Sequence, residues 1–516
     1  MVATFVLFLL MTALLAWEAG GAPVNAEVKQ FPDFDGLLPS KHYAGYITVG
    51  DQEHKRHLYY YFATSERSPT EDPLTIWING GPACAGLSGL FQLVGKIRSL
   101  GLSRLSTDLS MLRNGEKSRE ITSHGLRRGD EKLRGELRRE KEEAVVGAED
   151  GGVGQRREEA TMVGRELRRA WRWRQVSNLL FVDYPAGTGY SYADIPEDYI
   201  TNDAKSVSDL YEFISKWFRE YPEFLPNPLY LAGCSYSGVV VPVLAQDIAN
   251  GIEAGGEPTL NFKGYSLGNA AIDIDIQSNA QVPYAHRMGL ISNELYEDLS
   301  RSCSGKYWNN SHPDCLRNLE IFEMQTTGIN KEHILCLPCH HEMGVSMNIE
   351  EYESIRMHQS LHGDNEYSIY CHNYEKYPQT LFDLESTREC LHAMPAEVTG
   401  KWKRCSVQVQ YERNIWDLTS YHLNLTMKGY RAFFYSGDHD MVLPYTATLK
   451  WIRRFNYSEI EKWRPWFVDE HIAGYTVRFD HNIVFATLKG AGHTVWEYLP
   501  REALICYQRW IDADSL

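Results

Sequence analysis

The hydrophobic positions along the chain fall into short apolar runs separated by segments with helical spacing. Six apolar runs predict β-strands, at residues 59–62, 74–77, 178–182, 229–232, 262–267 and 431–435. Residues 203–220 instead carry apolar side chains every three or four positions, which predicts an amphipathic helix that ends before Pro222. Because strands and helices alternate, the pattern predicts an α/β fold with a doubly wound, mostly parallel sheet.

Two stretches depart from this pattern. Between Met111 and Ala170 there are 15 Lys or Arg and 13 Asp or Glu among 60 residues, whereas 23% of the whole chain is charged. We interpret residues 92–172 as a disordered or non-native insertion, because they lack an apolar stripe that could dock on a core; a regulatory or partner-binding insert is the alternative. Residues 291–400 are Cys-rich and less regular, which predicts a lid or insertion. The α/β domain is then assembled from residues 26–91, 173–290 and 401–516.

The amino terminus has the pattern of an export signal. Residues 2–17 are almost wholly apolar and small residues follow, which predicts a signal peptide over residues 1–25; a buried amino-terminal helix is the alternative. No later segment approaches ~18 uncharged apolar residues, so we expect no membrane association after the signal is removed. Sequons at Asn309, Asn424 and Asn456 predict N-glycosylation. Together these features predict a secretory route that ends in the extracellular space or the vacuole.

Charge and cysteine content limit the expected partners. The 516 residues carry a formal net charge of −16, the opposite sign to that of a nucleic-acid-binding protein, so nucleic acid is not an expected partner. Ten cysteines are present, and an exported chain can oxidise them. Cys336 and Cys339 form a CxxC that His340 and His341 follow directly, but no second CxxC and no HxxxH appears. We therefore interpret them as cysteines that form disulfides, and we expect neither a metal nor another cofactor.

A candidate nucleophile lies where an apolar strand meets an apolar helix. The sequence GCSYSG at 233–238 places Ser235 at that junction. A serine at a sharp strand-to-helix turn exposes its Oγ, and the amino terminus of the helix stabilises nearby negative charge. The strict Gly-x-Ser-x-Gly pattern is not met, since Ser237 holds the second glycine position. An ordinary serine-rich turn is the alternative.

A candidate base and acid follow later in the chain, each just past an apolar run. His493 follows the sequence TLKGAG, and Asp438 and Asp440 lie in an acidic turn after the run at 431–435. The order Ser, Asp, His is that of α/β hydrolases. His493 would accept the Ser235 proton, and an Asp would hold its tautomer and stabilise the imidazolium. The local sequence leaves both Asp438 and Asp440 open as this acid.

The oxyanion of an acyl-transfer reaction needs two backbone N–H donors. One should be the N–H of Tyr236, directly after the nucleophile. The other should come from the glycine-rich sequence NGGP at 79–82, because glycine lets the backbone approach a substrate closely. Considered alone, NGGP would be an ordinary Gly-Pro turn.

Together these motifs resemble the serine carboxypeptidase family (peptidase S10). The resemblance covers roughly residues 30–91 and 173–512. The longest matching stretches are 77–84, 178–192, 233–238, 436–440 and 490–493. The sequences GNA at 268–270 and WRPW at 463–466 are most similar to the plant serine carboxypeptidase-like branch. That branch contains peptidases and also acyltransferases that use sugar-ester acyl donors.

The resemblance implies an α/β-hydrolase fold and assigns roles to individual residues. It implies Ser235, Asp440 and His493 as the catalytic triad. It implies Gly81 and Tyr236 as oxyanion donors, and places Asn79 and Gly80 in substrate binding. It also implies three disulfides, Cys84–Cys405, Cys303–Cys315 and Cys339–Cys371, with Cys336 as the alternative to Cys339. Cys234, Cys390 and Cys506 are then unpaired, and so is Cys336 unless it replaces Cys339.

The chain departs from the family at the residues that recognise a substrate carboxylate. Family carboxypeptidases use two acidic side chains there, and one directly precedes the nucleophile. In this chain that position is Cys234, and a thiol is a weak hydrogen-bond donor. The second acid lies in a Glu-x-Gly-Pro segment, where this chain has LVGK at 93–96. The resemblance therefore implies intact acyl-transfer machinery with altered carboxylate recognition.

These observations predict a serine carboxypeptidase-type hydrolase that releases C-terminal residues through an acyl-enzyme on Ser235. The close alternative is an acyltransferase that uses sugar-ester donors, with an alcohol in place of water at the acyl-enzyme. A non-catalytic, degraded paralogue is the third hypothesis. The expected substrate is accordingly a peptide or an acyl ester, and the sequence does not indicate an oligomeric state.

Overall fold

The computed structural model describes residues 22–30, 38–90, 176–336 and 376–516. The predicted insertion at 92–172, most of the predicted signal peptide and the predicted Cys339–Cys371 disulfide lie outside these residues. Within the described ranges, no helix has the length and apolar character needed to cross a lipid bilayer.

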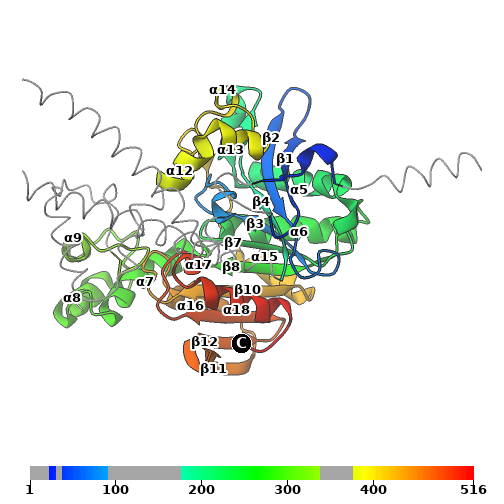
Figure 1. Cartoon of the computed structure of the whole chain (residues 1–516). Helices are drawn as coiled ribbons and strands as arrows, with labels where there is room; N and C mark the ends of the chain where they lie inside the picture. Colours follow the sequence, from blue (N-terminus) through cyan, green and yellow to red (C-terminus); the bar gives the residue numbers. More distant parts are fainter. Residues whose placement is uncertain (1–21, 31–37, 91–175, 337–375) are drawn as a thin grey trace, which may run out of the picture. The chain divides into compact units, whose positions relative to one another are not determined.

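One large sheet organises the described part of the chain (Figure 1). Its strands lie in the order β1-β2-β4-β3-β7-β8-β10-β13-β12-β11, and β5 pairs with β2. The strands are β1 (His42–Val49), β2 (Arg56–Ala63), β3 (Leu74–Ile78), β4 (Asn178–Val182), β5 (Tyr192–Ala193), β7 (Leu229–Cys234), β8 (Phe262–Gly268), β10 (Arg431–Gly437), β11 (Glu459–Val468), β12 (His471–Phe479) and β13 (Ile483–Leu488). From β4 to β13 the neighbours are parallel, whereas β1, β2, β11 and β12 add antiparallel edges. The predicted mostly parallel sheet is confirmed.

The elements predicted from the hydrophobic pattern are present. Each of the six predicted strands lies within an observed one, and the predicted helix matches α5 (Asp203–Glu220). The Asn202 side chain caps this helix by accepting a hydrogen bond from the Lys205 N–H. A separate two-stranded sheet pairs β6 (Ile200–Asn202) with β9 (Gln410–Glu412). Short 3-10 helices occupy η1 (Val24–Ala26), η3 (Pro196–Tyr199) and η4 (Pro222–Phe224).

Helices cover both faces of the central strands, as a doubly wound sheet requires. Leu231 of β7 joins one core with α5, α6 (Ser237–Glu253), α15 (Thr419–Met427) and α16 (Tyr445–Arg453). The neighbouring Tyr230 points to the other face, where its ring packs against Trp510 of α18 (Pro500–Ile511). Trp77 of β3 meets Trp496 of α17 (Val495–Tyr498) on this second face. Alternate residues of a strand thus serve two separate helical layers.

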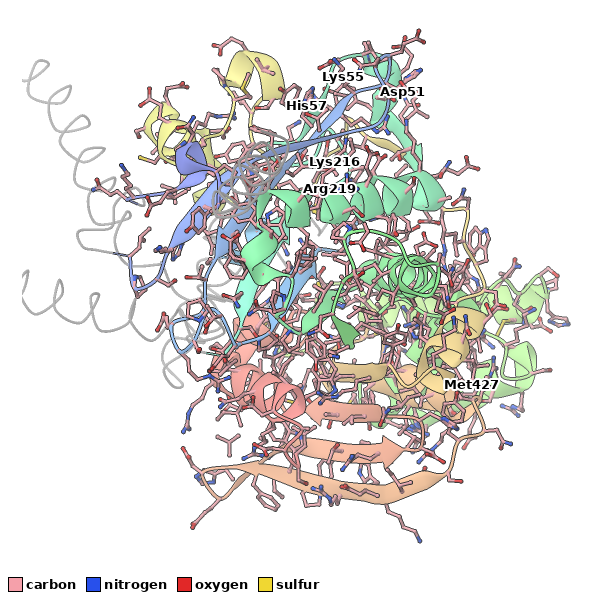
Figure 2. The ribbon with its side chains drawn as sticks, turned by 90° about the vertical axis from the view of Figure 1, so that its right-hand side faces the viewer. Asp51, Lys55, His57, Lys216, Arg219 and Met427 are labelled. Atoms are coloured by element: carbon pink, nitrogen blue, oxygen red, sulfur yellow. A yellow bond between two sulfur atoms is a disulfide. The ribbon has the colours of Figure 1, made fainter. Side chains whose placement is uncertain are left out.

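Helix α5 also fastens the outer hairpin formed by β1 and β2. Figure 2 shows Lys216 and Arg219 on α5, near the hairpin whose connection carries Asp51 and Lys55. The Lys216 ammonium donates to the Thr48 carbonyl oxygen at 2.8 Å. This polar contact supplements the apolar packing between the helix and β1.

The described part of residues 291–400 is more regular than the sequence indicated. It contains α8 (Asn293–Cys303), α9 (Pro313–Thr326), α12 (Lys376–Asp383), α13 (Glu385–Cys390) and α14 (Ala396–Thr399), and α7 (Ile274–Arg287) precedes it. In α8, Leu295, Leu299 and Cys303 recur every four residues and are buried. This spacing was a helical signal that the high cysteine content obscured. A lid role for this region stays a prediction.

Candidate active site

Ser235 occupies a sharp turn between β7 and α6. Its backbone φ is +56°, in the left-handed region that a non-glycine residue rarely adopts. Ser235 and Tyr236 are partly exposed, whereas the residues on either side of them are buried. The strand-to-helix turn predicted for Ser235 is therefore present, with the geometry of a nucleophile elbow.

The small residues around the elbow are required by close backbone contacts. A Cβ atom on Gly233 would lie 2.3 Å from the Ile78 carbonyl oxygen, and one on Gly238 would lie 2.3 Å from the Ala271 carbonyl oxygen. Both distances are far below van der Waals contact. At the second glycine position of the motif, the Ser237 hydroxyl donates to the Cys234 carbonyl oxygen at 2.5 Å. The departure from Gly-x-Ser-x-Gly is thus accommodated by a local hydrogen bond.

Asp440 and His493 form a buried pair. Asp440 Oδ2 lies 2.8 Å from His493 Nδ1, and the Asp440 side chain is fully buried. The other carboxylate oxygen of Asp440 accepts the N–H groups of Val442 and Leu443. The His493 N–H donates to the Glu332 carbonyl oxygen at 2.7 Å. Backbone contacts therefore fix both partners.

The structure distinguishes the two acids that the sequence left open. Asp438 Oδ1 lies 2.7 Å from His439 Nδ1 and accepts the Gly490 N–H at 2.7 Å. It therefore braces the loop that precedes His493, whereas Asp440 contacts the His493 imidazole itself. An acid that orients the base must make the second kind of contact.

Gly268 at the end of β8 and Asn269 directly after it bind the backbones of Ser235 and His493. The Ser235 N–H donates to the Gly268 carbonyl oxygen, and the His493 carbonyl oxygen accepts from the Asn269 side chain. Among the described residues, no hydrogen bond joins the Ser235 hydroxyl to the His493 imidazole. Such hydrogen bonds often tighten only in a substrate complex.

The glycine-rich loop after β3 presses directly on the elbow. A Cβ atom on Gly80 would lie 2.8 Å from Ser235 Cβ and 2.9 Å from the Tyr236 nitrogen. Gly81 has a φ of +119° and is exposed. Within the described part of the chain, neither the Gly81 N–H nor the Tyr236 N–H donates a hydrogen bond. Neither predicted oxyanion donor is therefore engaged within the described residues, and their role stays a prediction.

The side chains of Asn79 and Cys234 contact each other, and Asn79 also contacts the glycine-rich loop. The Asn79 amide donates to the Ala85 carbonyl oxygen at 3.1 Å and to Ser88 Oγ at 3.0 Å. Its oxygen faces the Cys234 thiol at 3.6 Å. Burial raises the pKa of the Cys234 thiol to about 12, so the thiol is uncharged at physiological pH. The Asn79 side chain thus holds the loop together, and Cys234 adds no ionisable group that could bind a substrate.

Two of the three predicted disulfides lie in the described residues, and both are present: Cys84–Cys405 and Cys303–Cys315. Cys234, Cys390 and Cys506 are free thiols, as the resemblance implied. The sequon asparagines Asn309, Asn424 and Asn456 are all exposed. Their surface positions are compatible with glycosylation, which stays a prediction.

Two supporting residues were missed by the sequence analysis. Asp183, directly after β4, accepts the Leu87 N–H at 2.8 Å and the Tyr190 N–H at 3.0 Å. Complete burial outweighs these hydrogen bonds and raises the pKa of Asp183 to about 7. Asn269, directly after β8, contacts the base loop. Both follow a predicted parallel strand, the same signal that identified Ser235, His493 and the acidic turn.

No group of three His, Cys, Asp or Glu residues capable of holding a metal ion occurs in the ranges that the structure describes. The candidate catalytic groups are the Ser235 elbow, the Asp440–His493 pair and the glycine-rich loop. They converge at the carboxyl ends of β3, β7, β10 and β13, where parallel α/β sheets place their ligands. A serine elbow, a buried acid–imidazole pair and a glycine-rich loop in this arrangement define an α/β hydrolase.

Comparison with known proteins narrows this class to a family. The serine carboxypeptidase family model matches residues 32–108 and 160–513, and the chain belongs to that family. Serine carboxypeptidase 1 of Hordeum vulgare is 34% identical, over 96% of this chain and 94% of that protein. Serine carboxypeptidase-like 8 of Arabidopsis thaliana is 36% identical, over 95% of each chain. The prohormone-processing carboxypeptidase Kex1(delta)p of Saccharomyces cerevisiae shares the fold, with a TM-score of 0.64 at 17% identity, over 95% of this chain and 96% of that one.

Proposed function

We propose that this chain is a serine carboxypeptidase-type hydrolase that works through an acyl-enzyme on Ser235. The observation that supports the proposal best is that Gly268 and Asn269, neighbours in the chain, bind the Ser235 elbow and the loop of the buried Asp440–His493 pair. The Gly268 carbonyl oxygen accepts the Ser235 N–H, and the Asn269 side chain donates to the His493 carbonyl oxygen. Family membership supports hydrolase chemistry at this site.

The proposed reaction follows from the positions of these groups. Ser235 Oγ attacks the carbonyl carbon of the scissile bond while His493 takes the hydroxyl proton. The Gly81 and Tyr236 N–H groups stabilise the oxyanion. His493 then returns the proton to the leaving amine or alcohol, which leaves an ester on Ser235. Water attacks this ester with His493 again as base, and the acid product departs as the Ser235 hydroxyl re-forms.

The acyltransferase alternative is favoured by one specific observation. The residue before the nucleophile, Cys234, is buried and uncharged, and its thiol faces Asn79. It cannot offer a carboxylic acid to the C-terminal carboxylate of a peptide. In this alternative an alcohol attacks the acyl-enzyme in place of water, and the acyl group arrives on a sugar ester.

Fluorophosphonate labelling of the purified, glycosylated chain tests the shared chemistry, with Ser235→Ala as the matched variant. We expect wild type to be labelled and Ser235→Ala not to be. A folded wild-type chain that resists labelling would instead support the non-catalytic paralogue. Circular dichroism of the same sample separates that result from a failure to fold.

Product analysis then separates the two enzyme hypotheses. The chain is given peptides with a free C-terminus and, separately, sugar-ester donors with and without an alcohol acceptor. Release of C-terminal residues supports the peptidase, and transfer to the alcohol that outpaces hydrolysis supports the acyltransferase. We propose an extracellular or vacuolar location, supported by the two disulfides and the exposed sequons.

A further inference from the structure

Asn269 follows β8 directly, and its side chain is fully buried. Its amide Nδ2 donates to two backbone carbonyl oxygens of the base loop, that of Gly492 at 2.9 Å and that of His493 at 2.7 Å. Its Oδ1 accepts the Gly437 N–H at 2.9 Å. Gly437 ends β10, three residues before Asp440. One side chain therefore ties the loop of the base to the strand end that leads to the acid.

The backbone around Asn269 also contacts β10 and the Ser235 elbow. The Asn269 N–H donates to the Tyr435 carbonyl oxygen of β10 at 2.8 Å. The neighbouring Gly268 carbonyl oxygen accepts the Ser235 N–H at 3.0 Å, and the Ala271 N–H donates to the Ser235 carbonyl oxygen at 2.8 Å. Residues 268–271 thus form hydrogen bonds with both backbone groups of Ser235, its N–H and its carbonyl oxygen.

The position demands asparagine for two reasons. Its φ is +37°, in the left-handed region that asparagine tolerates better than most residues. The three contacts also need one acceptor and two donors on the same short side chain, which an amide supplies. An aspartate would turn a second oxygen towards two carbonyl oxygens, and a leucine would leave three buried backbone groups without partners.

We propose that Asn269 is a positioning residue for the reaction: it sets the backbone of His493 relative to the strand end before Asp440 and to the Ser235 elbow. It touches neither the substrate nor the reacting atoms, and acts through the Gly437, Gly492 and His493 backbones. The proposal rests on the proposed function in one respect, since it takes Ser235 and His493 as nucleophile and base.

The chain contains a matched control for this role. Asn178 begins β4, at the opposite end of the parallel strands from the site, and is also fully buried. Its Oδ1 accepts the Ser65 N–H at 2.9 Å, and its Nδ2 donates to the carbonyl oxygens of Pro69 and Asp72, each at 3.0 Å. A longer contact joins Nδ2 to the Pro73 carbonyl oxygen at 3.5 Å. Replacing either asparagine by alanine therefore removes one accepted hydrogen bond and at least two donated ones, all with backbone groups.

The experiment compares Asn269→Ala and Asn269→Gly with Asn178→Ala in the full glycosylated chain. The glycine variant accepts the positive φ, so it removes the amide without adding backbone strain. The fluorophosphonate labelling rate is measured per folded molecule, well below the melting temperature of each variant. The downfield proton resonance of the Asp440–His493 hydrogen bond is recorded as a second readout that needs no substrate.

We expect both asparagine sites to lower the melting temperature comparably. Labelling should fall about 100-fold in the Asn269 variants, because a small displacement of catalytic groups has large effects on rate, and less than about threefold in Asn178→Ala. The resonance should shift or broaden only in the Asn269 variants.

The proposal would be overturned if the Asn269 variants had the same labelling rate and the same downfield resonance as Asn178→Ala. It would also be overturned if both Asn269 variants failed to fold while Asn178→Ala folded, since the role would then be purely structural. If wild type itself is not labelled, the proposed function has failed. The resonance in Asn269→Gly then decides the positioning role alone, an unchanged signal refuting it.

Discussion

The protonation of His493 depends on opposing influences from its surroundings. Burial disfavours the imidazolium, but the charge and hydrogen bond of Asp440, together with the charges of Glu332 and Glu497, outweigh it and raise the pKa of His493 to about 9. A general base must be neutral, so kcat/KM should rise with pH towards that value. In Asp440→Asn the acidic limb should move to lower pH and kcat should fall on the order of 10⁴-fold. The measurement is kcat/KM for a chromogenic ester as a function of pH.

Asp438→Asn is the matched control, because Asp438 lies in the same turn and contacts His439 rather than His493. In Asp438→Asn the acidic limb of kcat/KM should stay near its wild-type pH. The loss of kcat should be much smaller than in Asp440→Asn. A limb that moves equally in both variants would contradict the assignment of Asp440.

At Cys234, we expect a carboxylic acid to improve peptide turnover. The thiol is buried beside the Asn79 oxygen and stays uncharged. It is therefore only a weak hydrogen-bond donor to a substrate carboxylate. Hydrogen bonds to charged groups contribute about 1.5–3 kcal/mol, so Cys234→Glu should raise kcat/KM for peptides with a free C-terminus about 10-fold or more.

C-terminally amidated peptides are the substrate control, and Cys234→Gln has the same size without the acid. Neither should show the gain. Unchanged turnover by a folded Cys234→Glu chain would refute the view that carboxylate recognition is limited at this position.

Most individual residues of the site could be predicted from the sequence, and the reason is local. Ser235 and His493 each follow an apolar strand and lie among small residues, so a single stretch of sequence identifies each. Asp438 and Asp440 share one turn, and only the fold shows which of the two carboxylates reaches His493. The hydrogen-bonding role of Asn269 depends on loops more than 150 residues away, which no local pattern reveals.

At the scale of elements, helix α15 packs a neutral histidine against the sheet. His422 Nδ1 lies 2.6 Å from the Tyr265 hydroxyl of β8, and the ring packs against Phe434 and Trp451. Complete burial lowers the pKa of His422 to about 3. In the unfolded chain His422 binds a proton near pH 6.5, whereas in the folded chain it binds one only near pH 3. The stability that His422 contributes is therefore lost as the pH falls from about 6.5 towards 3. The sign is opposite at His493, whose raised pKa makes its contribution decline as the pH rises through about 9.

His422→Phe should therefore make the protein less sensitive to acid. Between pH 7.5 and pH 5, the variant should avoid about 2 kcal/mol of the loss in unfolding free energy seen in wild type. Urea denaturation at both pH values measures the difference, and His471→Phe, at an exposed strand position, is the control. Equal pH dependence in wild type and His422→Phe would show that His422 titrates normally.

Two of the strands that were missed share a physical cause. Strands β11 and β12 form the outer antiparallel hairpin, where charged and apolar residues mix on exposed faces. The pairing of these two strands shifts register at three places, so strict alternation of apolar and polar residues is lost. Buried parallel strands such as β4 are apolar throughout and were predicted without difficulty. The hydrophobic pattern of the sequence thus predicted strands best where their burial is most complete.

At the scale of the whole molecule, the Cys84–Cys405 disulfide joins the first and last pieces of the α/β domain. The two cysteines are 321 residues apart in sequence, whereas Cys303 and Cys315 are only 12 apart. A cross-link that closes a longer loop removes more entropy from the unfolded chain, so in that model the first bond should contribute about 3 kcal/mol more than the second. The first bond also lies beside the site, because a Cβ atom on Gly81 would meet Cys84 Sγ at 2.8 Å.

Replacing Cys84 and Cys405 together by serine should therefore reduce both stability and reactivity. We expect the free energy of unfolding to fall by about 2–5 kcal/mol. The fluorophosphonate labelling rate per folded molecule should fall up to about 100-fold, because the loop that positions the Gly81 N–H loses its anchor. The double variant Cys303→Ser/Cys315→Ser should be destabilised less and should label at nearly the wild-type rate, since its disulfide joins α8 to α9 rather than any part of the oxyanion loop. Equal labelling by both double variants would show that the glycine-rich loop is held by its contacts with the elbow, Asn79 and Asp183, without help from the disulfide.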